Sequence, residues 1–319
     1  MITTGDVAEN PKKSRRITSK NNQTMKKLLL FMTWLLTAAG SSASAQNVMK
    51  LEVGTSYTIV SSAEANTSLS YQWYRNGSAI SGATGTSYTV PTEEAYGSNV
   101  EFKRASYIEG CPERKFSNAA IITWCNLLIN GVCWADANVT QPGAFAPRPD
   151  MHTEFYQWNQ PNVPWPATGG LPAGTTWATD ITAPAWTATP CPEGWRLPTY
   201  AEIQALQDLP GDISDKRGYW AAGGARGNTM AGRFYGITAA RGQAGGCALP
   251  DDMVGCIFLP ASGRRNNAAG GLDSQNAYGN YWSSTQGNAT LGHRLGFTNT
   301  GHDIGANGKA YGFNVRCVQ

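Results

Sequence analysis

Two histidines and an aspartate near the end of the chain, His293, His302 and Asp303, are residue types that bind metals or transfer protons. The histidines are nine positions apart, a spacing that does not place them on one helix face, and the sequence shows no carboxylate or amide partner that would orient their rings. Ser283 or Ser284 could complete a serine–histidine–aspartate set, but the turn that exposes a nucleophilic serine does not surround them. We therefore predict a protein that is not an enzyme and that requires no cofactor or metal.

The seven cysteines are a second source of chemistry, because thiols of an exported chain form disulfides. The pairing that we predict is Cys191–Cys317, Cys247–Cys256 and Cys125–Cys133, with Cys111 left over. The first pair would tie the start of a domain to its end, and the other two would close short loops. The sequence does not prove this connectivity. A zinc site is the alternative, which the lack of any Cys-x-x-Cys pair disfavours.

Residues 286–311 have the composition of a recognition surface. Small polar side chains alternate with apolar positions at Leu291, Leu295, Phe297 and Ile304, so one side of a strand packs and the other is displayed. Adaptable polar residues with occasional aromatic ones are the chemistry of an antibody paratope. The ligand contacts that we predict are Arg264, Arg265, Asn266, Asn288, Thr290, His293, Arg294, Asn299, His302, Asp303, Asn307 and Tyr311. Two alternatives stay open: an ordinary solvated loop, and structural roles for Arg294 and Arg316 as partners of carboxylates.

The beginning of the chain predicts export. Met25, Lys26 and Lys27 form a short basic region, residues 28–39 are almost continuously apolar, and Ala43-Ser44-Ala45 has the small residues of a cleavage site. We expect residues 1–45 to be a leader with its signal peptide at 25–45, cleaved after Ala45, which leaves no membrane span. The mature protein would be secreted or held at the bacterial cell surface. A membrane anchor is the alternative.

Net charge and amino-acid composition limit the classes of molecule that this protein is expected to bind. Seven of the 25 Lys and Arg residues but only two of the 22 Asp and Glu residues precede residue 46, so the net charge changes from +3 for the whole chain to −2 for residues 46–319. Nucleic acid is therefore not expected as a partner. The 36 glycines, 11 tryptophans and a charged fraction of only 15% are typical of a loop-rich extracellular protein.

Residues 46–124 read as short strands. Tyr71 and Trp73 alternate onto one face before the turn Asn76-Gly77, and further strands are predicted over 87–91, 100–107 and 119–124. This segment resembles bacterial immunoglobulin-like modules, in which a tryptophan packs between two sheets. We expect Trp73 in the core.

Residues 125–319 predict one helix among strands and ordered loops. Thr199 and Glu202 form a capping box, and Ile203, Leu206 and Leu209 follow at helical spacing, so the helix should cover about 200–208. The strands should be 233–237, 257–259, 281–284, 293–297 and 313–318. Residues 160–190 should form an irregular loop layer that buries several tryptophans.

Five motifs carry a family resemblance: CPEGWRLPT (191–199), GRFYG (232–236), IFLPASG (257–263), GNYWSST (279–285) and GFNVRCV (312–318). Together they resemble the Fibrobacter succinogenes major paralogous domain, a family similar in fold to C-type lectins and to formylglycine-generating sulfatase-modifying proteins. The two resemblances together imply an all-β immunoglobulin-like sandwich over 46–124 followed by an α+β C-type-lectin-like domain over 125–319, with a small twisted sheet and long loops. Neither the late reactive cysteine pair of the sulfatase-modifying enzymes nor the calcium-binding tripeptides of sugar-binding lectins is present.

The polar stretch resembles a further class, the variable region of diversity-generating retroelement target proteins. Adenine-directed mutagenesis in those proteins excludes Glu, Lys, Gln, Met and Trp, and within residues 286–311 only Gln286 and Lys309 fall outside that alphabet. The resemblance implies that this region varies between copies of the protein.

The function that we predict is recognition or adhesion at the bacterial surface, with a surface protein or a glycan as the ligand. Two alternatives remain: a structural or tip subunit of a surface filament, and an enzyme that modifies glycans or proteins.

Overall fold

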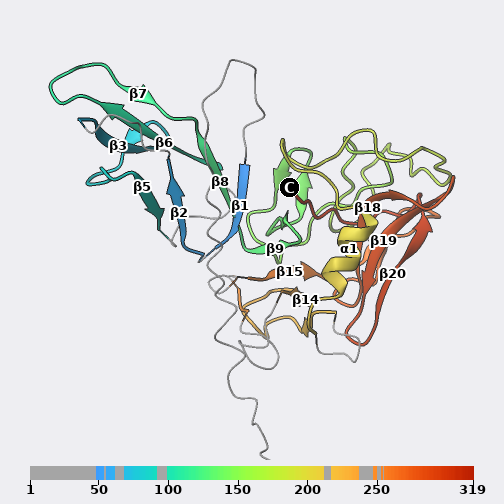
Figure 1. Ribbon diagram of the computed structural model, residues 1–319. Helices are drawn as coiled ribbons and strands as arrows, with labels where there is room; N and C mark the ends of the chain where they lie inside the picture. The colour runs from blue at the N-terminus through green and yellow to red at the C-terminus, as the bar shows by residue number, and fades with distance from the viewer. Residues whose placement is uncertain are drawn as a thin grey trace, which may run out of the picture. The chain divides into compact units, whose positions relative to one another are not determined.

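The computed structural model describes residues 48–53, 55–61, 68–91, 99–211, 217–236, 247–249, 253 and 255–319. The predicted leader and its cleavage site after Ala45 lie outside these residues. The described chain consists mostly of β-strands in small sheets, with a single α-helix (Figure 1). The predicted β-rich class is thereby confirmed. No described helix has the length and apolar character needed to cross a membrane.

The first part of the described chain contains two sheets. The larger sheet has the order β1 (Val48–Glu52), β8 (Ala120–Cys125), β6 (Asn99–Tyr107), β3 (Ser70–Arg75) and β4 (Ser78–Ala79), with β7 (Lys115–Phe116) also paired to β6. β1 runs parallel to β8, and the other pairs are antiparallel. The smaller sheet pairs β2 (Tyr57–Val60) with β5 (Ser87–Val90).

One hydrophobic cluster joins these two sheets. Trp73 of β3 is only 1% exposed and belongs to a cluster with Ile59 of β2, Val90 of β5 and Trp124 of β8. The prediction that Trp73 is a core residue is therefore confirmed. The turn after β3 forms at Asn76-Gly77, where both residues have positive φ (46° and 80°), the backbone that a two-residue hairpin turn requires.

The second part of the described chain contains the helix and five small groups of strands. Its hairpins are β9 (Leu127–Ile129) with β10 (Val132–Trp134), β11 (Val139–Gln141) with β12 (Ala144–Phe145), and β16 (Arg264–Arg265) with β17 (Leu272–Asp273). Its three-stranded sheets are β13 (Tyr219–Ala221), β14 (Gly232–Tyr235) and β15 (Ile257–Pro260), and β18 (Gly279–Gln286), β19 (Leu291–Phe297) and β20 (His302–Gly308). The strand predicted over 313–318 is instead a set of single bridges, such as Tyr156 with Phe313 and Arg196 with Val318, because this segment crosses several neighbours in turn.

The helix α1 (Tyr200–Gln207) begins where the capping box predicts. The Thr199 side chain accepts a hydrogen bond from the Glu202 amide, and the Glu202 carboxylate accepts one from the Thr199 amide. Ile203 and Leu206 point into a core cluster that also contains Leu295 and Phe297 of β19. The helix therefore packs beside the β18–β20 sheet (Figure 1).

All three predicted disulfides are present. Cys191–Cys317 joins residues 126 positions apart, and its Cα atoms are 6.0 Å from each other. Cys125–Cys133 links the end of β8 to β10, and Cys247–Cys256 closes a shorter loop. Cys111 is exposed and forms no disulfide. The long bridge brings the start and the end of the motif-bearing region together.

Four buried cations lock the loops of this second part. The four are Arg233, Arg265, Lys309 and Arg316, each at most 1% exposed. Their main acceptors are backbone carbonyls: Arg265 donates to Pro166, Gly169 and Gly270, and Arg233 donates to Gly218, Thr298 and Asn299. A buried carbonyl without a donor costs free energy, so each cation satisfies several loop carbonyls at once.

Arg316 lies next to Asp136, a residue whose carboxyl pKa is changed by burial. Asp136 is partly buried, its carboxylate accepts a hydrogen bond of 2.7 Å from Asn126, and its backbone carbonyl accepts one from the Arg316 guanidinium. Burial raises the pKa of Asp136 to about 7, while the Asn126 hydrogen bond and the Arg316 charge act in the opposite direction. The folded protein therefore holds this proton more tightly than the unfolded chain does.

Because of this raised pKa, we expect Asp136→Asn to increase the free energy of unfolding by an amount that depends on pH. The stability that Asp136 contributes is present below about pH 4 and is lost as the pH rises to about 7, because the ionised form is the one that burial disfavours. The variant should gain up to about 4 kcal/mol in the free energy of unfolding at pH 8 and nothing at pH 4. Urea unfolding at both pH values measures this, with the exposed Asp180→Asn as the control. A variant less stable than wild type at pH 8 would contradict the assignment.

Candidate functional site

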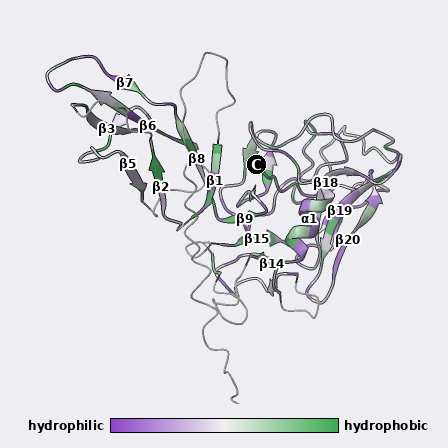
Figure 2. Cartoon of the chain, in the orientation of Figure 1, coloured by the Kyte–Doolittle hydropathy of each residue, from purple (hydrophilic) through white to green (hydrophobic). Residues whose placement is uncertain are grey.

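The sheet β18–β20 packs one side against the core around Leu295 and Phe297, and its other side is built on glycines and is covered in part by Trp158 and Trp282. Leu295 and Phe297 of β19 enter the core, with Ile304 of β20 packed against them. The intervening residues of β19 face the other way, because successive side chains alternate along a strand. We call this other side the glycine side; its residues are Gly292, Arg294, Gly296, Asp303, Gly305 and Asn307, which face one another in the β19–β20 register. Figure 2 shows hydrophilic residues along these strands.

An ion pair crosses the glycine side diagonally. Arg294 lies opposite Gly305 and Asp303 lies opposite Gly296, and the Arg294 Nη2 atom donates to the Asp303 carboxylate over 2.7 Å. A Cβ on Gly296 would collide with Arg294 Nη1, and one on Gly305 would lie 3.2 Å from the Asp303 carboxylate. The two glycines therefore make the room in which the pair lies. The Arg294 side chain is 9% exposed and that of Asp303 is 54% exposed.

A second ion pair flanks the end of β20. Arg264 and Asp273 are directly opposite in the β16–β17 hairpin, and Arg264 donates to the Asp273 carboxylate over 2.8 Å and 3.0 Å. The Arg264 guanidinium also lies 5.1 Å from the centre of the Tyr311 ring. Tyr311 in turn stacks on the buried Phe313. The sequence predicted Arg264 and Tyr311 as contacts but not Asp273. The pairing of Asp273 with Arg264 depends on the hairpin register and not on any spacing in the sequence.

The predicted contacts divide between the two ends of β19. Asn288 and Thr290 form the turn before β19, where the Asn288 side chain accepts from the Thr290 amide, and the Thr290 carbonyl accepts from the Lys309 amide. Asn299 lies in the turn after β19. With a rise of about 3.3 Å per residue, the two ends of this seven-residue strand are about 20 Å apart. The structure thus brings Asn288, Thr290 and Asn307 together and separates Asn299 from them.

The two histidines do not join Arg294 and Asp303, since they lie on the opposite side of the sheet. The His293 ring packs 4.4 Å from the Tyr200 ring, and a His302 ring nitrogen is 3.0 Å from the Tyr235 hydroxyl. Burial lowers the pKa of His302 to about 3, helped by the charges of Arg217, Arg233 and Arg294. His302 is therefore a neutral packing residue, which corrects its prediction as a ligand contact on one surface with Asp303.

Two residues of the predicted loop also have structural positions. Arg265 is fully buried and donates only to backbone carbonyls, which corrects the prediction that it is an exposed contact. Asn266 is partly buried, and its side chain accepts from the amides of Ala268 and Ala269. Its role is to hold the β16–β17 turn. The sequence does not distinguish Arg264 from Arg265, because only the strand register shows which one faces the core.

Lys309 is a functional support that sequence reasoning did not identify. Its ammonium group donates to the carbonyls of Ala183 and Ala289 and lies 5.6 Å from the centre of the Trp158 ring. It thereby joins the loop over 160–190 to the turn that carries Asn288. The sequence contained one sign of this role: Lys309 is one of the two residues within 286–311 that adenine-directed mutagenesis does not produce.

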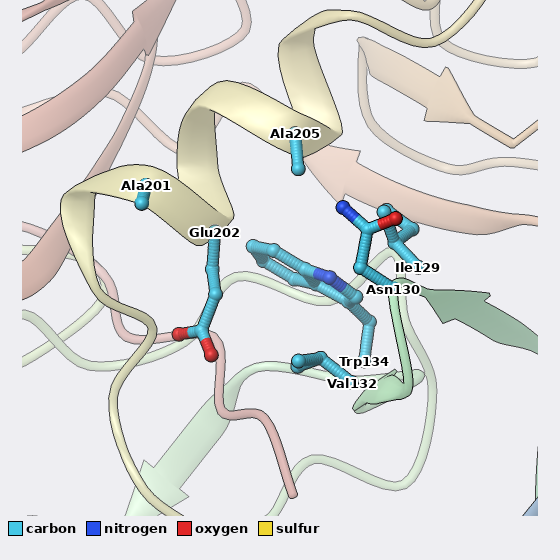
Figure 3. A pocket seen from close by; sticks show the side chains of 7 residues that line it. All are labelled: Ile129, Asn130, Val132, Trp134, Ala201, Glu202 and Ala205. Atoms are coloured by element: carbon cyan, nitrogen blue, oxygen red, sulfur yellow. The ribbon is translucent and has the colours of Figure 1, made fainter.

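A separate small pocket lies between α1 and the β9–β10 hairpin (Figure 3). It encloses about 140 Å³ and is lined by Ile129, Asn130, Val132, Trp134, Ala201, Glu202 and Ala205. The carboxylate of Glu202, its one ionisable lining group, is already bonded to Arg196 and to the Thr199 amide. The lining is otherwise mainly apolar and holds no set of groups for acid–base chemistry. Across the described residues, no group of three or more His, Cys, Asp or Glu could hold a metal ion.

The comparison with known families agrees with the motifs. Residues 66–319 match the family model described as Fibrobacter succinogenes major domain. The match begins well before Cys191, where the first of the five motifs starts, and so includes much of the first part of the chain. No curated protein and no solved structure matches the chain.

Proposed function

The chain belongs to the Fibrobacter succinogenes major domain family, and on that premise we propose that it is an exported recognition protein. The glycine side of β19–β20, together with Arg264, Asp273, Asn288, Thr290 and Tyr311, forms the binding face. The observation that carries this proposal is a partly exposed, hydrogen-bonding face on a framework held by buried cations and a long disulfide. A face that is ordered before binding loses little conformational entropy when a ligand arrives.

The proposal includes an arrangement of two domains. An immunoglobulin-like domain over 46–124 would present a C-type-lectin-like domain over 125–319. The cluster that joins the two sheets around Trp73 and the small sheets with long loops after Cys125 support it. Oxidised cysteines are consistent with export by the leader and with a place at the cell surface.

Variation of the binding face by a diversity-generating retroelement is part of the same proposal. Of the two residues outside the restricted alphabet, Lys309 is the buried clamp described above and Gln286 donates to the Asn288 carbonyl, so both support the face. Sequencing the locus in many isolates should then show substitutions at Asn288, Thr290, Asp303 and Asn307, with Lys309 constant. Substitutions spread evenly over 130–319 would contradict this part.

Binding by this face is tested with one triple variant. The full-length chain, purified after export, is screened for binding to bacterial cells, host cells, glycans and surface proteins. Arg264→Ala/Asp303→Ala/Asn307→Ala should lose at least about tenfold in affinity, because hydrogen bonds to charged groups contribute about 1.5–3 kcal/mol each. The matched control is Gln204→Ala/Asp208→Ala, which changes two exposed side chains at α1, on the Leu295 side of the sheet. Equal binding by both variants would remove the face from the proposal.

A further inference from the structure

The strand β20 is the open edge of its sheet. Among the described strands it pairs only with β19, and Figure 1 shows it as the outermost of the three. At one end of the uninterrupted β19–β20 register, the Lys309 amide donates to the Thr290 carbonyl. At the other end, the Thr298 amide donates to the Gly301 carbonyl. The hydrogen-bonded pairs therefore fall on the odd-numbered residues of β20, and the backbone groups of its even-numbered residues point away from β19.

Four backbone groups on this edge are free to pair with another strand. They are the N–H and C=O groups of Ile304 and Ala306, which have no hydrogen-bond partner among the described residues. The carbonyls of His302 and Gly308, on either side, already accept hydrogen bonds from outside the sheet. No lysine, proline or bulge lies along β20 to discourage pairing, and Ala306 is exposed. Open sheet edges usually carry such protection, because their unpaired backbone groups attract another strand.

These free groups fit a second copy of β20 in one antiparallel register. When Gly305 lies on a twofold axis, Ile304 faces Ala306 of the second copy, and this pair exchanges two hydrogen bonds on each side of the axis. All the free groups of both strands are then used. A register shifted by two residues pairs Ile304 or Ala306 with itself. It places the other one opposite His302 or Gly308, whose carbonyls are already occupied.

The side chains beside the axis are complementary in the same register. Asp303 of one copy lies opposite Asn307 of the other; both are at least partly exposed, and such cross-strand neighbours are close enough to interact. The Asp303 Oδ2 atom accepts from Arg294, and the Asn307 side-chain oxygen accepts from the next amide. Among the described residues, the other Asp303 oxygen and the Asn307 NH2 group have no partner, so each pair can form a hydrogen bond. The two Asp303 carboxylates are offset along the strands by about 13 Å, so they repel each other only weakly.

We propose that two copies of this chain associate through β20, so that their two three-stranded β18–β20 sheets join into one continuous sheet. The contact is the same on both copies, so it closes at two and does not grow into a filament. It places the two binding faces beside each other on one side of the joined sheet, which lets a ligand with repeated groups bind both at once. The pairing needs no ligand and therefore stands or falls separately from the proposed function.

The test measures the mass of the full-length chain, purified after export, by sedimentation equilibrium at several protein concentrations. Every sample carries Cys111→Ser, which excludes dimers linked by that exposed cysteine. We expect a reversible monomer–dimer equilibrium. Asn307→Asp sets a carboxylate opposite Asp303 twice and should weaken dimerisation about tenfold, whereas Asp303→Asn/Asn307→Asp exchanges the two groups and should restore it. A monomer at every concentration, or equal association with and without Asn307→Asp, would overturn the proposal.

A cysteine cross-link locates the contact independently. The register sets Gly305 opposite itself as a non-hydrogen-bonded pair, with Cα atoms about 4.5 Å apart and within disulfide range. Gly305→Cys should therefore form a disulfide-linked dimer under mild oxidation, and the control Thr300→Cys, on an exposed turn, should not. A Cβ on Gly305 would lie 3.2 Å from the Asp303 carboxylate, so circular dichroism checks the fold; should Gly305→Cys not fold, the Asn307→Asp comparison decides. Equal cross-linking of both variants, or a monomer that pairs β20 with an extended segment of another protein, would refute self-association.

Discussion

Loss of the Cys191–Cys317 disulfide is expected to lower the free energy of unfolding by about 4–5 kcal/mol. The bridge joins residues 126 positions apart, and in the chain-entropy model the stabilisation grows with the logarithm of the loop that is closed. Both cysteines are buried, so Cys191→Ser/Cys317→Ser also places two hydroxyls in a core cluster. Urea unfolding of the folded, oxidised protein measures the loss.

The matched control for this prediction is Cys125→Ser/Cys133→Ser. These cysteines are buried as well, but they are only eight positions apart, so the loss should be about 2.5 kcal/mol. Equal losses for the two pairs would show that packing at the sulfurs, and not loop closure, carries the stabilisation. If neither variant refolds at low urea, the midpoint of thermal unfolding gives the same ranking.

The second large effect is expected at Arg316. Its guanidinium donates to the carbonyls of Ala135 and Phe258 and to the Asn138 side chain, each over 2.8–2.9 Å, and also to the Asp136 carbonyl. Arg316→Met keeps much of the volume and removes every donor, so several buried acceptors lose their partner. We expect the free energy of unfolding to fall by about 3–5 kcal/mol.

Arg264→Met provides the comparison for Arg316. Arg264 is partly exposed and makes one ion pair with a partly exposed carboxylate, so its loss should cost less than about 1 kcal/mol. Chemical unfolding of both variants under the same conditions measures the difference. Similar losses would mean that the carbonyl clamps do not stabilise the loops in the way that the burial of Arg316 indicates. Retained near-ultraviolet circular dichroism would show that Arg316→Met keeps its tertiary packing before unfolding, so that the two losses can be compared.

Patterns within a few residues were sufficient for much of the fold. The capping box at Thr199 and Glu202 placed the helix to within one residue, and Asn76-Gly77 marked a hairpin turn. The alternation around Leu295 and Phe297 predicted a strand with one displayed side; the structure has the strand, but Gly292, Arg294 and Gly296 on its other side are buried as well. These features succeed because caps, turns and alternation are local consequences of backbone hydrogen bonding and of side-chain direction.

The candidate site depended on contacts that such patterns do not contain. Arg264 and Arg265 are neighbours of the same type, yet one is displayed and the other is buried. His302 and Asp303 are adjacent, yet they point to opposite sides of the sheet. Composition grouped all of these residues together because it does not distinguish one side of a strand from the other.

The sequence by itself determined the β-rich class, the helix and the family motifs, because each depends on residue type and on local spacing. It predicted the disulfide partners without proving them, since Cys191 and Cys317 are 126 positions apart. Only the tertiary structure decided which polar residues share a face, which cations clamp loops and which carboxylate pairs with which arginine. The physical reason is that a buried cation donates hydrogen bonds to carbonyls of chain segments far away in the sequence, as Arg265 does to Pro166 and Lys309 does to Ala183. The partners of these hydrogen bonds follow from strand register and from the path of the loops, which are properties of the folded chain as a whole.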